Sequence, residues 1–343
     1  MLASQKWGNA KMSDPFEALP RVEVRGDRDL RDILAGERPV VLKGLVADWP
    51  AVAGGRSPES MTAYLKAMDR GAPAPVMEAP AHSGGRFVYT DYLREFNFTK
   101  RQRGVSETLD LIAAHVGQAD APFVAMQMLP LHTHLPDFVR DNPFSLLPPQ
   151  IMPRLWVGGP VRTQTHNDRD HNIACVVAGR RRFLLFPPDQ VNNLYVGPLD
   201  NPPPLSLVDP EAPDYDRFPR FREAMAAASV AYLEPGDALF LPKYWWHHVT
   251  SLAPYNVLVN YWWGDTAKGL ERANDCFLTA LLALKDLPAG ERRYWQAMFD
   301  AYVFGDGEAV AHIPPARRGP LGPLDAARRA QLKADLKMAY LKS

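Results

Sequence analysis

The chain has 343 residues, and its 39 basic side chains balance its 39 acidic ones, so the formal net charge at pH 7 is zero. A neutral chain has no general affinity for nucleic acid or for an acidic membrane surface, and we expect neither as a partner. Apolar residues make up 46% of the chain. No stretch approaches the roughly 20 consecutive apolar residues that a membrane-spanning helix needs.

Proline and cysteine usage narrow the class of protein further. The 33 prolines are spread along the whole chain, which favours short strands and turns over long helices. Cys175 and Cys276 each lie among apolar neighbours, a pattern that predicts buried free thiols in a reducing compartment. The N-terminal residues hold no continuous apolar run of the signal-peptide kind. We therefore expect residues 1–19 to form a flexible tail and the protein to be cytoplasmic.

The first part of the chain predicts a mixture of strand and helix. Residues 38–45 read as a buried strand that ends at a glycine. Residues 57–68 predict a helix, because Ser57 is a good cap, Pro58 suits the first turn and apolar residues follow at helical spacing. Residues 106–116 predict a second helix, with Ser106 as its cap.

The centre of the chain predicts a β-rich core. Residues 154–187 alternate in polarity and are rich in β-branched and aromatic types, which indicates consecutive strands. Residues 198–220 hold many prolines and acidic residues and predict a long surface loop. Further strands are expected at 229–233, 238–241 and 255–263, the first two joined by a Glu-Pro-Gly-Asp turn.

From residue 266 the pattern becomes helical, with an apolar stripe from Leu270 to Leu284 and further helices at 291–302 and about 325–341. The fold class is therefore mainly β with flanking helices, and a central barrel fits best. We expect one barrel domain with an N-terminal α/β extension over residues 20–265. A C-terminal helical region is expected over residues 266–343.

One short motif has the spacing of a metal site. His166 and Asp168 are two positions apart on an expected strand, so their side chains point to the same face. The missing ligand is expected from a neighbouring strand, and His247 and His248 are the candidates. Adjacent residues on extended backbone face opposite ways, so only one of them can bind. Two histidines and one carboxylate suit Fe(II). On spacing alone the alternative is an exposed His-x-Asp loop and a structural histidine pair.

Longer segments carry a resemblance to a known family. The chain resembles the cupin-like branch of the JmjC oxygenases, the branch that includes the asparaginyl hydroxylase factor inhibiting HIF. The resemblance covers about residues 20–265, and its most specific part is the Gly-Asp…Pro…Trp-Trp-His-His string that ends at His248. The segments that carry it are 38–50, 166–168, 179–188, 235–242 and 244–249.

This resemblance implies a fold, a cofactor and roles for particular residues. The implied fold is a double-stranded β-helix, or jelly roll. The implied cofactors are Fe(II), bound by His166, Asp168 and His247, and 2-oxoglutarate, which is consumed with O₂. Arg181 lies where the family has a lysine for the far carboxylate of 2-oxoglutarate. The other residues implied to line the cosubstrate pocket are Thr163, Asn172 and Asn260.

The implied activity is hydroxylation of a protein side chain or a small molecule, with no substrate named by the sequence. Relatives dimerise through helices that follow the barrel, so a homodimer is expected through the region from residue 266. The alternative is a non-enzymatic cupin that binds a ligand or regulates a partner. The arginine at 181 and the lack of a tyrosine in 123–127 keep it open. A metal-dependent isomerase or sugar-binding cupin would favour His-x-His, and Asp168 argues against it.

Overall fold

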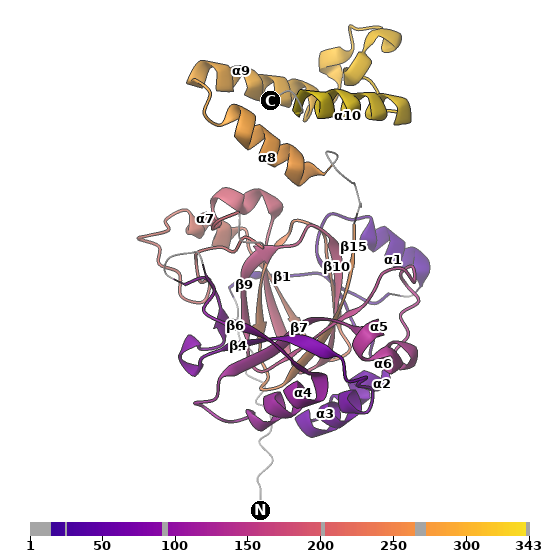
Figure 1. The fold of residues 1–343 in the computed structure, drawn as a ribbon, viewed down its shortest axis with the longest axis vertical. Helices are drawn as coiled ribbons and strands as arrows, with labels where there is room; N and C mark the ends of the chain where they lie inside the picture. Colours follow the sequence, from indigo (N-terminus) through magenta and orange to yellow (C-terminus); the bar gives the residue numbers. More distant parts are fainter. Residues whose placement is uncertain (1–14, 25, 91–94, 200–202, 265–271, 341–343) are drawn as a thin grey trace, which may run out of the picture. The chain divides into compact units, whose positions relative to one another are not determined.

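The computed structural model describes residues 15–24, 26–90, 95–199, 203–264 and 272–340. The chain divides into two compact units, Met1–Gly264 and Asp265–Ser343. Figure 1 shows that the first unit holds the strands and that the second consists of helices. The predicted fold class, mainly β with flanking and C-terminal helices, is confirmed. No helix of the described ranges is both long and apolar enough to cross a membrane.

The first unit contains two sheets, and the smaller one has six strands. In spatial order these are β1 (Glu17–Ala18), β12 (Ser229–Leu233), β11 (Arg181–Phe186), β14 (Trp246–Ser251), β9 (Arg162–Asn167) and β5 (Arg86–Phe87). Strand β1 lies in the segment that the sequence analysis assigned to a tail. It pairs in parallel with β12, while residues 1–14 lie outside the described ranges.

The larger sheet has nine strands. In spatial order these are β2 (Arg21–Val22), β3 (Val40–Leu42), β13 (Ala238–Leu241), β10 (His171–Ala178), β15 (Asn256–Trp263), β8 (Arg154–Gly158), β7 (Phe123–Pro130), β4 (Pro73–Ala79) and β6 (Thr99–Gly104). The expected strands of 154–187 are thus β8 to β11, which are divided between the two sheets. Strand β13 has the bounds that the sequence predicts.

The two sheets face each other and enclose an apolar core, as in a jelly roll. Phe183 and Leu185 of the smaller sheet pack in one cluster with residues of the larger sheet, among them Ala174, Val176 and Leu258. Side chains alternate along each strand, so the neighbours of these residues point outward. We call the space between the sheets the barrel interior.

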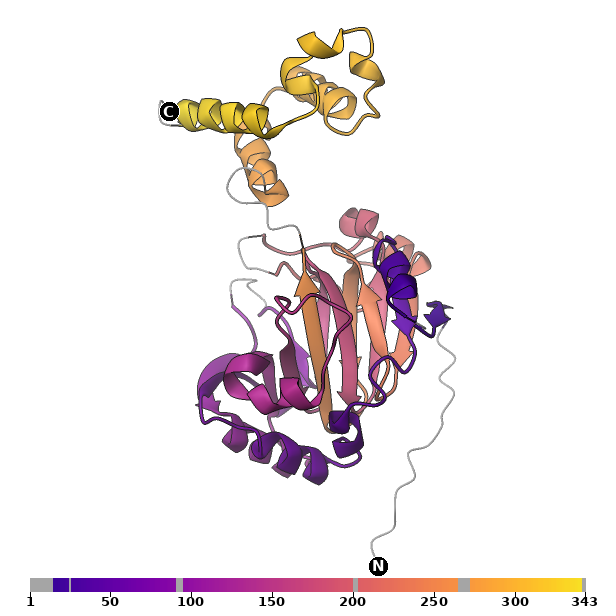
Figure 2. The same cartoon turned by 90° about the vertical axis from the view of Figure 1, so that its right-hand side faces the viewer.

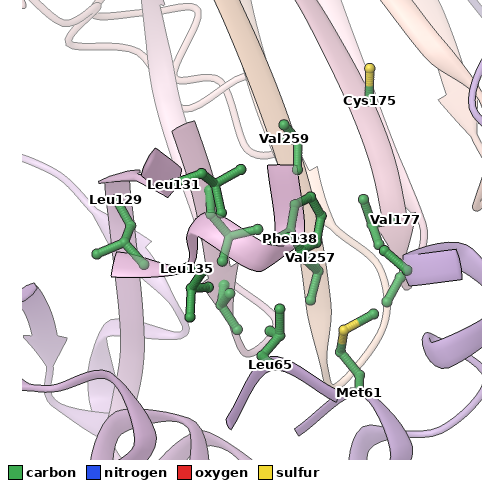
Figure 3. Packing of buried hydrophobic residues seen from close by; sticks show 14 of the residues in the cluster. Met61, Leu65, Leu129, Leu131, Leu135, Phe138, Cys175, Val177, Val257 and Val259 are labelled. Carbon is green, nitrogen blue, oxygen red and sulfur yellow. The ribbon is translucent and has the colours of Figure 1, made fainter. Parts of the chain in front are cut away.

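The outer face of the larger sheet is covered by helices. Outward-pointing Cys175, Val177 and Val257 pack with Met61 and Phe138 from helices, as Figure 3 shows. Figure 2 shows these helices along one side of the strands. The helices of the first unit are α1 (Asp27–Leu34), α2 (Pro50–Gly54), α3 (Pro58–Lys66), α4 (Val105–Ala114), α5 (Leu131–His134), α6 (Pro136–Asp141) and α7 (Phe221–Ala226), with short 3₁₀ turns η1 (Ala81–Ser83) and η2 (Pro188–Asn192).

The predicted caps of two helices have different outcomes. Ser57 caps α3 as expected, since its hydroxyl accepts a hydrogen bond from the Ser60 amide. Ser106 does not cap α4, whose N-cap is Gly104. The Ser106 hydroxyl instead donates to the Asp69 carboxylate at 2.6 Å. The prediction was wrong because a partner 37 residues away is invisible to a local pattern.

The second unit consists of α8 (Ala273–Leu284), α9 (Ala289–Tyr302), α10 (Ala326–Tyr340) and the 3₁₀ turns η4 (Glu308–Val310), η5 (Pro315–Arg317) and η6 (Gly319–Leu321). Neither α8 nor α9 buries any side chain fully. Cys276 in α8 is exposed, which corrects the expectation of two buried thiols. Leu270, the first residue of the predicted stripe, lies outside the described ranges.

Candidate functional site

Three potential metal ligands meet on strands β9 and β14. His166 lies near the end of β9, Asp168 follows that strand directly, and His247 of β14 pairs opposite His166. The two imidazole rings have their centroids 4.3 Å apart, and His247 Nε2 lies 3.8 Å from an Asp168 carboxylate oxygen. Each of the three residues offers one possible ligand atom, and these three atoms all lie within 4.8 Å of one another.

Backbone carbonyls fix how both imidazoles present their second nitrogen. His166 Nδ1 lies 2.8 Å from the Gln164 carbonyl, and His247 Nδ1 lies 3.0 Å from the Trp245 carbonyl. A carbonyl only accepts, so each Nδ1 carries the proton and donates it, and each Nε2 keeps its lone pair for a metal. Burial, with His166 beside it, lowers the pKa of His247 to about 4. That imidazole is therefore neutral at physiological pH, as a metal ligand must be.

Asp168 is held from two sides. Its carboxylate accepts a hydrogen bond from Trp262 Nε1 at 3.3 Å, and its backbone carbonyl accepts one from the Tyr244 amide at 2.8 Å. Tyr244 has a positive φ of 71°, an uncommon conformation for a residue with a side chain. The Asp168 side chain is 29% exposed. The site is thus buried on the His247 side and open to solvent on the Asp168 side.

The two adjacent histidines take opposite faces of β14. His247 points into the barrel interior beside His166, whereas His248 points to the outer face, where it is 1% exposed. Neither ring nitrogen of His248 has a hydrogen-bond partner within the described ranges. His247 is therefore the member of the pair that joins the candidate metal set.

Arg181 brings a buried positive charge to the same interior. It pairs with Ser251 of β14 and shares a face of β11 with Phe183, and it is 8% exposed. Burial lowers the pKa of its guanidinium to about 10, so the group is still charged at pH 7. Its Nε has no hydrogen-bond partner, and no carboxylate from the described part of the chain pairs with it. A buried cation of this kind is costly unless an anion joins it.

A bulge in β9 turns Thr163 toward the interior as well. His247 pairs with His166 while Val249 pairs with Thr163, so three positions of β9 match two of β14. Thr163 and His166 have opposite strand parity, and a regular strand would place them on opposite faces. The extra residue cancels that difference. Both side chains therefore lie on the interior face.

Asn172 and Asn260 meet inside the barrel. The Asn260 amide donates to Asn172 Oδ1 at 2.6 Å, and both residues are about 4% exposed. The remaining Asn260 oxygen has no partner, and neither has Trp156 Nε1 on the same interior face. Such buried polar atoms require a partner. The interior therefore presents unsatisfied donors and acceptors together with Arg181.

Sequence reasoning missed two residues of this site. Trp262 orients Asp168 through its hydrogen bond. Trp156 packs edge-on against the Trp262 ring, with ring centroids 5.9 Å apart. One signal for Trp262 was available, because it has the same strand parity as Asn260. Trp156 gave no such signal, since its place opposite Leu258 depends on the pairing of β8 with β15.

Comparisons with known proteins agree with this geometry. Residues 27–269 match the family described as "Cupin-like domain". The chain is 38% identical over 112 residues to human "HSPB1-associated protein 1", a match that covers 32% of this chain and 22% of that protein. It is 26% identical over 262 residues to "Lysine-specific demethylase 8" of Xenopus tropicalis, covering 73% and 54%.

A further relative is "tRNA wybutosine-synthesizing protein 4" of Neurospora crassa, which is 27% identical over 271 residues, covering 76% of this chain and 21% of that protein. The chain thus spans between about a fifth and a half of the length of these relatives. Their names do not support the narrower expectation of a branch close to factor inhibiting HIF.

Proposed function

Since this chain belongs to the JmjC-type cupin-like family, we propose that it is an Fe(II)- and 2-oxoglutarate-dependent oxygenase that hydroxylates a protein side chain or a small molecule. One observation carries the proposal. A two-histidine, one-carboxylate set lies in the same barrel interior as a buried arginine with no carboxylate partner among the described residues. The set suits the metal, and the arginine suits the free carboxylate of a dianion.

The donor set fits Fe(II) because two imidazole nitrogens and one carboxylate oxygen converge within 4.8 Å of one another. His166, Asp168 and His247 would hold the metal and leave the opposite side for cosubstrate and O₂. When bound, the metal and 2-oxoglutarate supply the oxidising chemistry. The protein's own residues orient the ligands, keep a positive charge at the far end of the pocket and limit the entry of water.

We propose that Arg181 and Thr163, whose side chains both lie on the interior face, hold the far carboxylate of 2-oxoglutarate. Arg181 pairs with Ser251, and Ser251 is four residues along β14 from His247. Four residues of strand span about 13 Å. A five-carbon dicarboxylate and the reach of an arginine side chain together cover that distance. The guanidinium would bind the carboxylate through two parallel hydrogen bonds, where a lysine would offer a point charge.

The substrate of the proposed reaction remains a class rather than a compound. The relatives are named for a demethylase, for tRNA wybutosine synthesis and for association with HSPB1. Fold and cofactor do not choose among such targets. The partners we propose are therefore 2-oxoglutarate, O₂ and one substrate of a kind that screening must identify.

Calorimetric binding of 2-oxoglutarate to the Fe(II)-loaded protein without O₂ tests the proposal. Arg181→Ala is expected to weaken binding by at least about a hundredfold, because a charge-assisted bidentate contact is lost. Asp168→Ala is expected to abolish binding through loss of the metal. Arg180→Ala and Asp170→Ala are matched controls, since each alters an exposed neighbour of the same type.

Conversion of 2-oxoglutarate to succinate in air provides the second readout. The wild type is expected to turn over slowly without any added substrate, and Asp168→Ala is expected not to. Wild-type protein that holds Fe(II) but binds no 2-oxoglutarate would contradict the proposal. The non-enzymatic reading, a cupin that binds another ligand, would then take its place.

We also propose that the protein is a homodimer through the second unit. Helices α8 and α9 leave large apolar side chains exposed, and Leu282 is 81% exposed. The others on these two helices include Phe277, Leu278, Tyr294 and Trp295. Apolar surface of this extent indicates a protein interface. The mass of one chain is 38.3 kDa. Light scattering is expected to give twice this mass for the wild type and the mass of one chain for Leu282→Glu.

A control for that measurement is Lys337→Glu on α10, which changes charge outside the apolar face and should stay dimeric. A single-chain mass for the wild type at every concentration would exclude the dimer. We propose a cytoplasmic location, which the two free cysteines support because such thiols are typical of reducing compartments.

A further inference from the structure

The outer face of the six-stranded sheet carries a row of basic residues. Arg86 of β5 pairs with Arg162 of β9, Arg162 pairs with Thr250 of β14, and Thr250 pairs with Arg182 of β11. Paired residues share a face, and their Cβ atoms are about 5 Å apart. Thr163, Val249 and Phe183 point inward, so this row points outward. It lies on the far side of the strands that carry His166 and His247.

The charges of this row are incompletely neutralised. Asp209 pairs with Arg86 at 3.1 Å, and Glu211 pairs with Arg182 at 2.9 Å. Within the described ranges, no acidic side chain pairs with Arg162. Two arginines directly opposite each other on neighbouring strands repel. Arg86 and Arg162 together with Asp209 therefore leave one positive charge that a bound anion would balance.

Unpartnered polar atoms lie next to this row. The Thr250 hydroxyl is buried and has no hydrogen-bond partner in the described part of the structure. His248 shares the outer face of β14 with Thr250, and both of its ring nitrogens are buried and unpartnered as well. Leaving such groups unsatisfied is unfavourable.

A cavity of about 230 Å³ opens beside the row. Arg86, Gln164 and Asp209 line it, and Arg217 adds a second arginine that has no carboxylate partner within the described segments. The rings of Tyr89 and Phe218 also line it. One water occupies about 30 Å³ of liquid, so the cavity has room for a small anion but is below the size of drug-like ligand sites.

We propose that this cavity is a phosphate-binding site in which Arg86 and Arg217 of its lining hold the anion, Arg162 reaches it from beside Arg86 on the neighbouring strand, and Asp209 orients Arg86. Three guanidinium groups and one carboxylate leave a charge of two, and phosphate carries about −1.5 to −2 at pH 7. The aromatic walls would also admit a phosphate ester with a small apolar group. This site is separate from the barrel interior and does not rest on the proposed function.

Titration calorimetry of the full chain with inorganic phosphate tests the proposal. Binding in the submillimolar range is expected, and Arg162→Gln and Arg217→Gln are each expected to weaken it by about tenfold or more. Neither arginine has a carboxylate partner among the described residues, so both variants should fold, which circular dichroism melting would check. Arg101→Gln, on strand β6 and 60% exposed, is the matched control and should bind as the wild type does.

Two further arms complete the design. Arg181→Ala should leave phosphate binding unchanged, which separates this site from the proposed 2-oxoglutarate pocket. Phenyl phosphate binding more tightly than inorganic phosphate would assign the site to an ester, and equal binding would assign it to the free ion. A dissociation constant above about 10 mM would be too weak for a specific site. Failure of both compounds to bind at about that concentration would therefore overturn the proposal. Equal binding by wild type and Arg162→Gln would overturn it too.

Discussion

The imidazoles of the candidate site depend on single backbone atoms for their orientation. Carbonyls of Gln164 and Trp245 each hold one ring nitrogen, so the other nitrogen is directed toward Asp168. Trp262 does the same for the carboxylate. Loss of a group that orients a metal ligand in this way typically lowers metal affinity by about 10- to 100-fold. Three hydrogen bonds, to the Gln164 and Trp245 carbonyls and from Trp262, therefore orient the three candidate metal ligands.

Replacing Trp262 with phenylalanine keeps an aromatic ring but removes the donor to Asp168. We expect Trp262→Phe to weaken divalent metal binding by roughly 10- to 100-fold. Competition with a metal-binding dye under anaerobic conditions measures the change. Trp263→Phe is the matched control, because Trp263 stacks on Phe240 and His171. Among the described residues, Trp262 donates a hydrogen bond to Asp168 and Trp263 does not. Equal affinities for the two variants would contradict this prediction.

At the scale of elements, the turn between β12 and β13 secures the strands around the site. Gly236 has a φ of 94°, which a glycine adopts without strain. The Asp237 carboxylate is 1% exposed and accepts hydrogen bonds from the Gly44 amide and the Lys43 ammonium, each at 3.0 Å. It thereby joins the segment after β3 to the turn. The Pro-Gly-Asp turn therefore has a structural role, because it connects β13 to the segment that follows β3.

Removal of the Asp237 carboxylate should destabilise the first unit. We expect Asp237→Ala to lower the free energy of unfolding by about 2 kcal/mol, because the Gly44 amide and the half-exposed Lys43 ammonium lose a charged acceptor. Urea unfolding followed by tryptophan fluorescence measures it. Glu234→Ala in the same turn is the control and should cost at most about 0.5 kcal/mol, since its pair with Arg180 is exposed on both sides. An equally small loss of unfolding free energy for Asp237→Ala would refute the structural role of the Asp237 carboxylate.

At the scale of the whole molecule, the candidate site and the exposed apolar helices α8 and α9 belong to different compact units. Every candidate ligand and pocket residue lies in Met1–Gly264, and the exposed apolar helices lie in Asp265–Ser343. Ligands that bind only folded protein stabilise the unit that binds them. The two units should therefore respond differently to metal.

Calorimetry of the full chain is expected to show two unfolding transitions, of which only one shifts on addition of Fe(II) or Co(II). At a free metal concentration a hundred times the dissociation constant, the stabilisation should be about 2.7 kcal/mol. Asp168→Ala should remove the shift, and Asp170→Ala should retain it. A metal-induced shift of both transitions, or of neither, would count against a site confined to the first unit.

The sequence by itself determined several strands of the core and the juxtaposition of His166 with Asp168. Alternation in 154–187 and at 229–233, 238–241 and 255–263 reflects one buried face per strand, which neighbouring residues encode. The same two-residue period placed His166 and Asp168 together and separated His247 from His248. These features are local, so they can be read from the order of residues. The jelly-roll expectation came from the family resemblance, and the structure confirms it.

Only the tertiary structure decided what faces what across the chain. The bulge of β9 turns Thr163 into the interior, and the contact between Asn172 and Asn260 joins residues 88 positions apart. Burial of Arg181 without a carboxylate partner in the described chain, and the row from Arg86 to Arg182, follow from strand register. Register depends on packing between distant segments, and a shift of one residue would turn each side chain to the other face. No local pattern contains that information.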